Sequence, residues 1–131
     1  MAQRNEPTAW VGWVFFGAAM MLVIGLMHII AGLVGLFNND FYVATSNALI
    51  AFDFTTWGWI HLAAGVLLLA TGIGVLAGAA WARVSGVILT SIAVLVNVSF
   101  LSVTPLWSLV GIVLGCFVVF ALAMHGQEIE E

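Results

Sequence analysis

Charged side chains are scarce in this chain of 131 residues. Only 6% of the residues are Asp, Glu, Lys or Arg, whereas roughly 25% are charged in soluble globular domains. Hydrophobic residues make up 64% of the sequence. This composition excludes a soluble globular domain and predicts an integral membrane protein.

Basic residues are almost absent, because Arg4 and Arg83 are the only ones and the formal net charge is −4. No basic patch is available for a phosphate backbone or for anionic lipid headgroups. Nucleic acid is therefore excluded as a partner. The lipid bilayer is the expected partner, and other membrane subunits or further copies of this chain are candidate partners.

Cysteine is limited to Cys116, which has no second thiol for an intramolecular disulfide and no neighbours at the spacing of a zinc or iron–sulfur site. The chain also lacks a nucleophile elbow, an HExxH motif and a phosphate-binding glycine loop. We therefore expect no catalytic residue and no metal site. A non-enzymatic protein is the interpretation that this pattern favours.

Four long apolar runs dominate the sequence, at about residues 10–37, 56–78, 81–101 and 106–124. A helix needs about 20 apolar residues to cross a bilayer, so each run predicts a span. The connectors at 78–80 and 102–105 are short enough only for antiparallel hairpins. The predicted fold class is all-α: an integral membrane four-helix bundle of antiparallel up-down spans, forming one transmembrane domain over residues 1–131.

Orientation is predicted from the two arginines, since loops rich in Lys and Arg stay in the cytoplasm. Arg4 precedes the first run and Arg83 begins the third, so both termini are predicted to be cytoplasmic. The six tryptophans fall near the ends of the runs, as in two aromatic belts. The inner belt comprises Trp10, Trp13 and Trp81, and the outer belt comprises Trp57, Trp59 and Trp107.

The segment 38–55 would then form the outer loop. Its apolar residues fall roughly on one helical face, opposite Ser46 and Asn47, which predicts a short helix lying in the membrane interface. The apolar residues concerned are Phe41, Tyr42, Ala48, Leu49 and Phe52.

Polar side chains inside the spans define the candidate site. His28, His61 and Asn97 share helical faces with small residues, which mark helix contacts in lipid. We therefore predict that all three face the bundle interior, with Trp57 on the same face as His61 and Asp53 just before that span. Intramembrane ionisable groups are costly, which favours a functional cluster. The structural alternative is that each polar group only bridges helices.

Depth bears on what the two histidines could hold. At a rise of about 1.5 Å per residue, His28 lies about 13 Å below the outer boundary and His61 about 6 Å. Axial haem ligands need nearly matched depth, so this difference of about 7 Å disfavours haem. A site of His28, His61 and Asp53 for a metal is disfavoured too, because Asp53 is in the loop.

Several segments together resemble a bacterial family of small four-span membrane proteins that is known as a domain of unknown function. They are the stretch from Asp53 to His61 (DFTTWGWIH), Gly65, Trp81-Ala-Arg83, Asn97-x-x-Phe100-Leu101 and Pro105-Leu-Trp107-Ser108. The resemblance extends over about residues 10–124. It implies a four-helix integral membrane fold in a bacterial cytoplasmic membrane, and it implies no activity.

Two functions remain open on these grounds. The first is a small polytopic accessory or assembly subunit without enzymatic activity. The alternative is a membrane protein that binds a hydrophobic redox cofactor, quinone or haem, in the outer half of the bundle. The candidate cofactor-binding residues are His28, His61, Asn97, Asp53 and Trp57.

Overall fold

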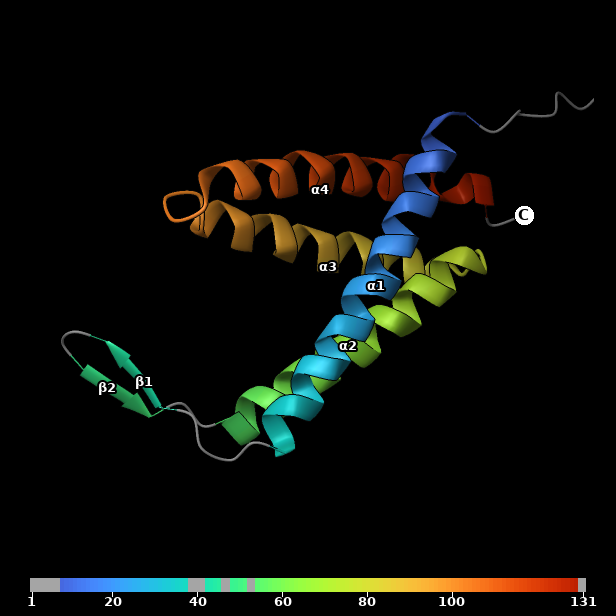
Figure 1. Cartoon of the computed structure of the whole chain (residues 1–131). Helices are drawn as coiled ribbons and strands as arrows, with labels where there is room; N and C mark the ends of the chain where they lie inside the picture. The colour runs from blue at the N-terminus through green and yellow to red at the C-terminus, as the bar shows by residue number, and fades with distance from the viewer. Residues whose placement is uncertain (1–7, 38–41, 46–47, 52–53, 130–131) are drawn as a thin grey trace, which may run out of the picture. The chain divides into compact units, whose positions relative to one another are not determined.

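Four long helices make up most of the computed structural model, which describes residues 8–37, 42–45, 48–51 and 54–129. They are α1 (Trp10–Phe37), α2 (Phe54–Leu76), α3 (Ala80–Ser99) and α4 (Pro105–His125), and the 3-10 helix η1 (Gly126–Ile129) follows α4 (Figure 1). Each of the four is long and apolar enough to cross a membrane. The predicted all-α, four-span fold class is confirmed.

The segment between α1 and α2 contains strands, so the predicted interfacial helix is wrong. β1 (Tyr42–Thr45) pairs with β2 (Ala48–Ala51) in antiparallel register, with Tyr42 opposite Ala51 and Thr45 opposite Ala48. The helical-face argument overlooked that aromatic and β-branched residues such as Tyr42, Val43 and Ile50 favour strands. Phe41, Ser46, Asn47 and Phe52, which also entered that argument, lie outside the described residues.

The chain divides into two compact units, and each is described here by itself. Unit 1 contains the described residues up to Met21 and those from Ala70 onward, and unit 2 runs from Leu22 to Leu69. The first half of α1 and the end of α2 therefore belong to unit 1 with α3, α4 and η1. The remainder of α1 and α2 belongs to unit 2 with the two strands.

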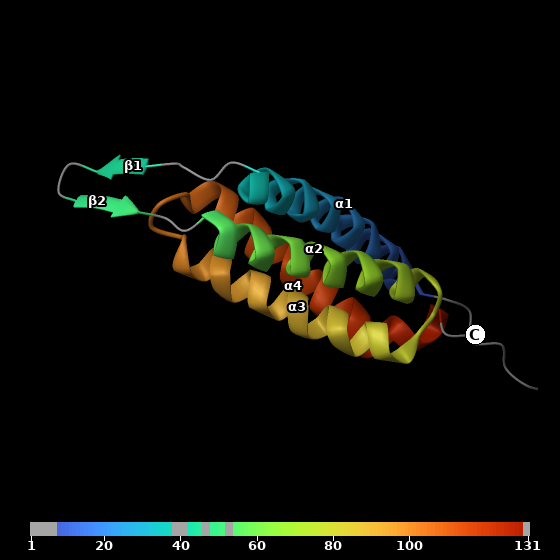
Figure 2. The same ribbon diagram turned by 90° about the horizontal axis from the view of Figure 1, so that it is seen from below.

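In unit 1, α3 and α4 lie side by side in antiparallel directions (Figures 1 and 2). Gly111 of α4 lies against Asn97 near the end of α3, while Leu122 lies against Gly86 near its beginning. Buried aliphatic side chains form the core of this unit: Val14, Ala18, Met21, Val75, Ala82, Val118, Ala121 and Leu122. Interlocking side chains thus hold unit 1 together.

A tight connector joins α2 to α3, as the sequence predicts. Gly78 has a φ of 73°, a left-handed conformation that glycine adopts without the steric cost of a Cβ atom. The amide of Ala79 donates to the carbonyl of Gly74 at 2.8 Å, and the amide of Gly78 donates to that of Val75 at 3.0 Å. This pair of bonds is a Schellman motif, which ends α2 and lets the chain reverse.

In unit 2, α1 and α2 approach each other through glycine. A Cβ atom on Gly65 would lie 2.6 Å from the carbonyl oxygen of Gly25, and one on Gly32 would lie 2.6 Å from the amide nitrogen of Leu62. Such spacing lets the two backbones touch, as small residues do between membrane helices. Residue 25 meets 65 while residue 32 meets 58 and 62, so the two helices are antiparallel.

Candidate functional site

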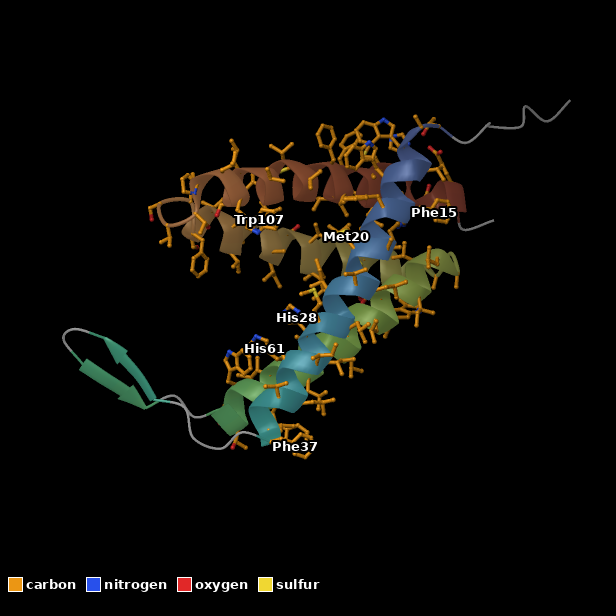
Figure 3. The ribbon with its side chains drawn as sticks, viewed as in Figure 1. Phe15, Met20, His28, Phe37, His61 and Trp107 are labelled. Carbon is orange, nitrogen blue, oxygen red and sulfur yellow. The ribbon has the colours of Figure 1, made fainter. Side chains whose placement is uncertain are left out.

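The imidazole rings of His28 and His61 lie next to each other in unit 2. Their centroids are 5.3 Å apart and their planes are inclined by only 17°, so the rings are stacked. His28 comes from α1 and His61 from α2, and Figure 3 shows both rings on the same side of the helix pair. Both side chains are half-buried. We call these two residues the histidine pair.

The nearby glycines explain how the histidine pair forms. Gly32 lies one turn after His28 on α1, and Gly65 lies one turn after His61 on α2. Each brings the partner backbone within contact distance. Because residues four apart share one face of a helix, the contact that these glycines permit also brings the two imidazoles together.

Each imidazole makes one hydrogen bond to its own helix. Nδ1 of His28 donates to the carbonyl oxygen of Ile24 at 2.9 Å, and Nδ1 of His61 donates to that of Trp57 at the same distance. A carbonyl oxygen can only accept, so both Nδ1 atoms carry the proton. Within the described ranges, neither Nε2 atom has a hydrogen-bond partner.

Trp57 extends the stack on the side of α2. Its ring centroid lies 3.9 Å from that of His61, with the planes inclined by 31°. Gly35 of α1 leaves the room for this indole, because a Cβ atom there would lie 2.9 Å from Cε3 of Trp57. Trp57, His61 and His28 therefore form a run of three aromatic rings across the two helices.

The predicted difference in depth between the two histidines is wrong. Seven residues separate His61 from the start of α2 at Phe54, and nine separate His28 from the end of α1 at Phe37. The sequence-based estimate of depth placed the start of the second span at Trp57, three residues after the actual start of α2 at Phe54. Three residues of helix correspond to about 4.5 Å. With that offset removed, the two rings lie close enough to stack.

Haem does not fit this arrangement. An iron atom between two axial ligands requires both imidazoles to point their nitrogens at it from opposite sides. The rings of His28 and His61 instead lie face to face at 5.3 Å. The argument from unequal depth therefore no longer applies. The orientation of the two rings is the reason that haem is disfavoured.

Asn97 belongs to unit 1, and its described contacts lie there. Its Nδ2 donates to the carbonyl of Ala93 at 2.9 Å, one turn earlier on α3. Its Oδ1 lies 2.7 Å from where a Cβ atom on Gly111 would stand, so the amide fills space between α3 and α4. These contacts suit a helix-packing role. Asp53, the remaining candidate, lies outside the described residues.

Sequence reasoning assigned no role to His125, which belongs to a polar cluster at the ends of α1 and α4. Nδ1 of His125 donates to Oε1 of Glu128 at 2.6 Å, and the Trp10 ring stacks on the imidazole at 5.6 Å. Thr8 donates to the same carboxylate from its amide at 2.8 Å and from its hydroxyl at 3.1 Å. We call these four residues the terminal cluster.

The terminal cluster places a negative charge at the start of α1. α1 has no acidic residue in its first turn, although a negative charge there interacts favourably with the helix dipole. Glu128 supplies that charge from 120 residues further along the chain. The spacing of His125 and Glu128, three residues apart after an apolar run, was the available sequence signal.

A second surface feature of unit 1 is an open apolar groove beside α4. It has a volume of about 400 Å³, and its lining residues are Trp10, Ile112, Val113, Cys116, Phe117 and Phe120. Trp10 packs on Phe120 at 4.7 Å between ring centroids, which shapes one end of the groove. We call this feature the α4 groove.

Comparison with known families gives a match over most of the chain. Residues 13–127 match the family described as Domain of unknown function (DUF7144), and the chain belongs to that family. No curated protein and no solved structure matches this chain significantly.

Proposed function

We propose that this DUF7144 member binds a lipid-soluble aromatic ligand of the quinone type at the histidine pair. The observation that supports this function is the stacking of His28 on His61 at 5.3 Å, contributed by two different spans. Imidazoles are costly in a bilayer, and a pair with unused ring nitrogens in the described region favours a ligand. Trp57 adds a third aromatic ring to this stack, with its centroid 3.9 Å from that of His61.

The test is to identify what the purified protein retains. The protein is extracted in a mild detergent, and its organic extract is examined by ultraviolet absorption after chemical oxidation and again after reduction, so that a ligand retained in either redox form is detected. We expect a quinone-type chromophore in stoichiometric amount in the parent. His28→Phe and His61→Phe keep a flat apolar ring but remove the nitrogens, and each should lower retention by about tenfold.

Trp59→Phe is the matched control, because Trp59 is on the same helix but 59% exposed. It should retain as much ligand as the parent protein. An extract with no more quinone than the surrounding lipid contains would refute this function. Equal retention in the parent and both histidine variants would refute it as well.

An accessory or assembly role is the second candidate function, and the α4 groove is the observation that favours it. Its apolar lining runs along one face of α4, at the positions where a helix of another membrane subunit would pack. Cys116 lies in this groove, is exposed and is the only cysteine of the chain. It is therefore a ready attachment point for a cross-linker.

A photoreactive maleimide on Cys116 should capture one defined membrane subunit in native membranes. The control is Cys116→Ala combined with Ala63→Cys, which moves the label to an exposed position of α2 in unit 2. Capture of the same subunit from both positions, or of lipid alone from Cys116, would argue against the groove as a docking site. A cross-linked homodimer would identify a second copy of this chain as the occupant.

Location and topology complete the proposal. The four spans form one transmembrane domain in a bacterial cytoplasmic membrane, with both termini cytoplasmic and the 38–55 segment outside. Arg4 and Arg83 are the support for this orientation. Single cysteines placed in the segment 38–55 of a Cys116→Ala background should react with a membrane-impermeant reagent from outside intact cells; reaction only after lysis would reverse the orientation.

A further inference from the structure

The direction of the two intrahelical hydrogen bonds sets which redox form of a ligand the histidine pair can bind. We infer that the pair selects the hydroquinone, an aromatic diol, over the corresponding quinone. This inference rests on the proposed function and specifies its ligand. It depends on the contacts of His28 and His61 and on the ring stack with Trp57.

Both imidazoles keep their proton on Nδ1, because each Nδ1 lies 2.9 Å from a backbone carbonyl that can only accept. An uncharged imidazole has a single ring proton. In the uncharged form, Nε2 of His28 and Nε2 of His61 are therefore both acceptors. The histidine pair presents lone pairs and no donor to a ligand.

A quinone oxygen is also an acceptor, so it would face these nitrogens lone pair to lone pair. A hydroquinone hydroxyl donates and satisfies them. Within the hydrocarbon region no water replaces a missing donor, and an unsatisfied polar group is costly there. The polarity of the site therefore opposes the oxidised ligand and favours the reduced one.

The surroundings of the two acceptors specify an aromatic and lipid-soluble diol. The rings of Trp57, His61 and His28 follow one another at 3.9 Å and 5.3 Å, which favours a flat ring as neighbour. Both helices are apolar spans, so the ligand must partition into lipid. Two acceptors on adjacent rings favour a ligand with more than one hydroxyl group.

Nitrogen NMR of the imidazoles tests the first step of this inference. Protein labelled with ¹⁵N-histidine is measured in detergent, and His28→Phe and His61→Phe assign the two signals. We expect both residues as the Nδ1-protonated tautomer, with Nε2 unprotonated. An Nε2-protonated tautomer at either residue overturns the inference, because that ring would then offer a donor.

Ligand binding tests the second step. Equilibrium dialysis of the full chain in detergent compares three probes with the same ring: trimethylhydroquinone kept reduced, trimethylbenzoquinone, and the dimethyl ether of the hydroquinone. We expect the hydroquinone to bind at least about tenfold more tightly than the other two. The preference should disappear in His28→Phe and His61→Phe and persist in Trp59→Phe.

The outcomes separate this inference from the function on which it rests. If the three probes bind equally in the parent protein and more weakly in both histidine variants, selection for the hydroxyl is wrong while the ligand site stands. If the quinone binds more tightly than the hydroquinone, the inference is also wrong. If no probe binds the parent protein, both the inference and the proposed function fail.

Discussion

The two compact units are held together in different ways. In the described part of unit 2 every buried residue is a glycine: Gly25, Gly32, Gly35, Gly58 and Gly65. Unit 1 instead buries aliphatic side chains, such as Val14 and Leu122. The same helical architecture is thus stabilised by backbone contact in one unit and by interlocking side chains in the other.

This difference determines how well each unit can accommodate an added methyl group at a buried glycine. At Gly65 the atoms that a Cβ would meet include the Gly25 carbonyl and the Ile29 amide, which move only with the helix. At Gly86 in unit 1 the nearest atoms are the ends of the Leu122 and Met21 side chains, at 3.0 and 3.1 Å. Flexible side-chain ends can shift by a few tenths of an ångström, and a backbone cannot.

The largest expected effect therefore comes from Gly65→Ala. The new methyl group must separate α1 from α2, and we expect a loss of about 2–3 kcal/mol in the free energy of unfolding in detergent. Gly86→Ala is the matched control and should change stability by less than about 1 kcal/mol, because helix propensity offsets the tighter fit. Equal losses in both variants would mean that the two units do not differ in this way.

The next largest loss of stability is expected from a change in backbone conformation at Gly78, rather than from a steric clash with a neighbouring helix. Gly78→Ala places a Cβ atom in the left-handed region, which costs about 1–2 kcal/mol in unit 1. Gly12→Ala is the control, because a Cβ atom there meets nothing within 4 Å. Thermal unfolding followed by circular dichroism measures both variants, and an unchanged midpoint for Gly78→Ala would contradict the role of the Schellman motif.

Asn97→Ala should have a smaller effect, about 0.6 kcal/mol, the average for polar contacts between membrane helices. The side-chain hydrogen bond of Asn97 runs to Ala93 on its own helix, so packing at Gly111 is its described contact with α4. Ser99→Ala removes a comparable bond to Leu95 and serves as the control. Loss of hydroquinone binding in Asn97→Ala would show that Asn97 contributes to the ligand site after all.

The smallest global effect is expected at the terminal cluster. Glu128→Ala removes the acceptor for the Thr8 amide and hydroxyl, so amide hydrogen exchange at the start of α1 should become faster. The global unfolding midpoint should stay the same, because this cluster lies at the helix ends. Gln127→Ala is the control, since Gln127 is exposed. Unchanged exchange in Glu128→Ala would show that the cluster does not fasten α1.

The spans could be predicted from sequence because their signals are local. Long apolar runs, the Gly78 connector and Pro105 at the first position of α4 each act over a few residues. The segment 38–55 was predicted less well, since eight of its residues form strands rather than a helix. Helical-face patterns over so short a segment do not distinguish a helix from paired strands.

The candidate site was predicted only in part. His28, His61 and Trp57 were identified as polar or aromatic groups on inward faces, and the structure brings these three together. Their relative depth was misjudged because a tryptophan was taken as the helix start. His125 was missed because its partners Thr8 and Trp10 are more than 110 residues away in the chain.

The sequence by itself determined that this is a small protein of four apolar helices, because hydropathy, helix length and turn chemistry are local properties. Only the tertiary structure decided how far one helix slides along its neighbour, and with it the stacking of His28 on His61. The position of one helix along the other depends on which glycines of α1 and α2 contact each other. The residue pattern within a single helix does not predict those pairs. The choice of Nδ1 as donor in both rings then follows from the helical carbonyl that each ring faces.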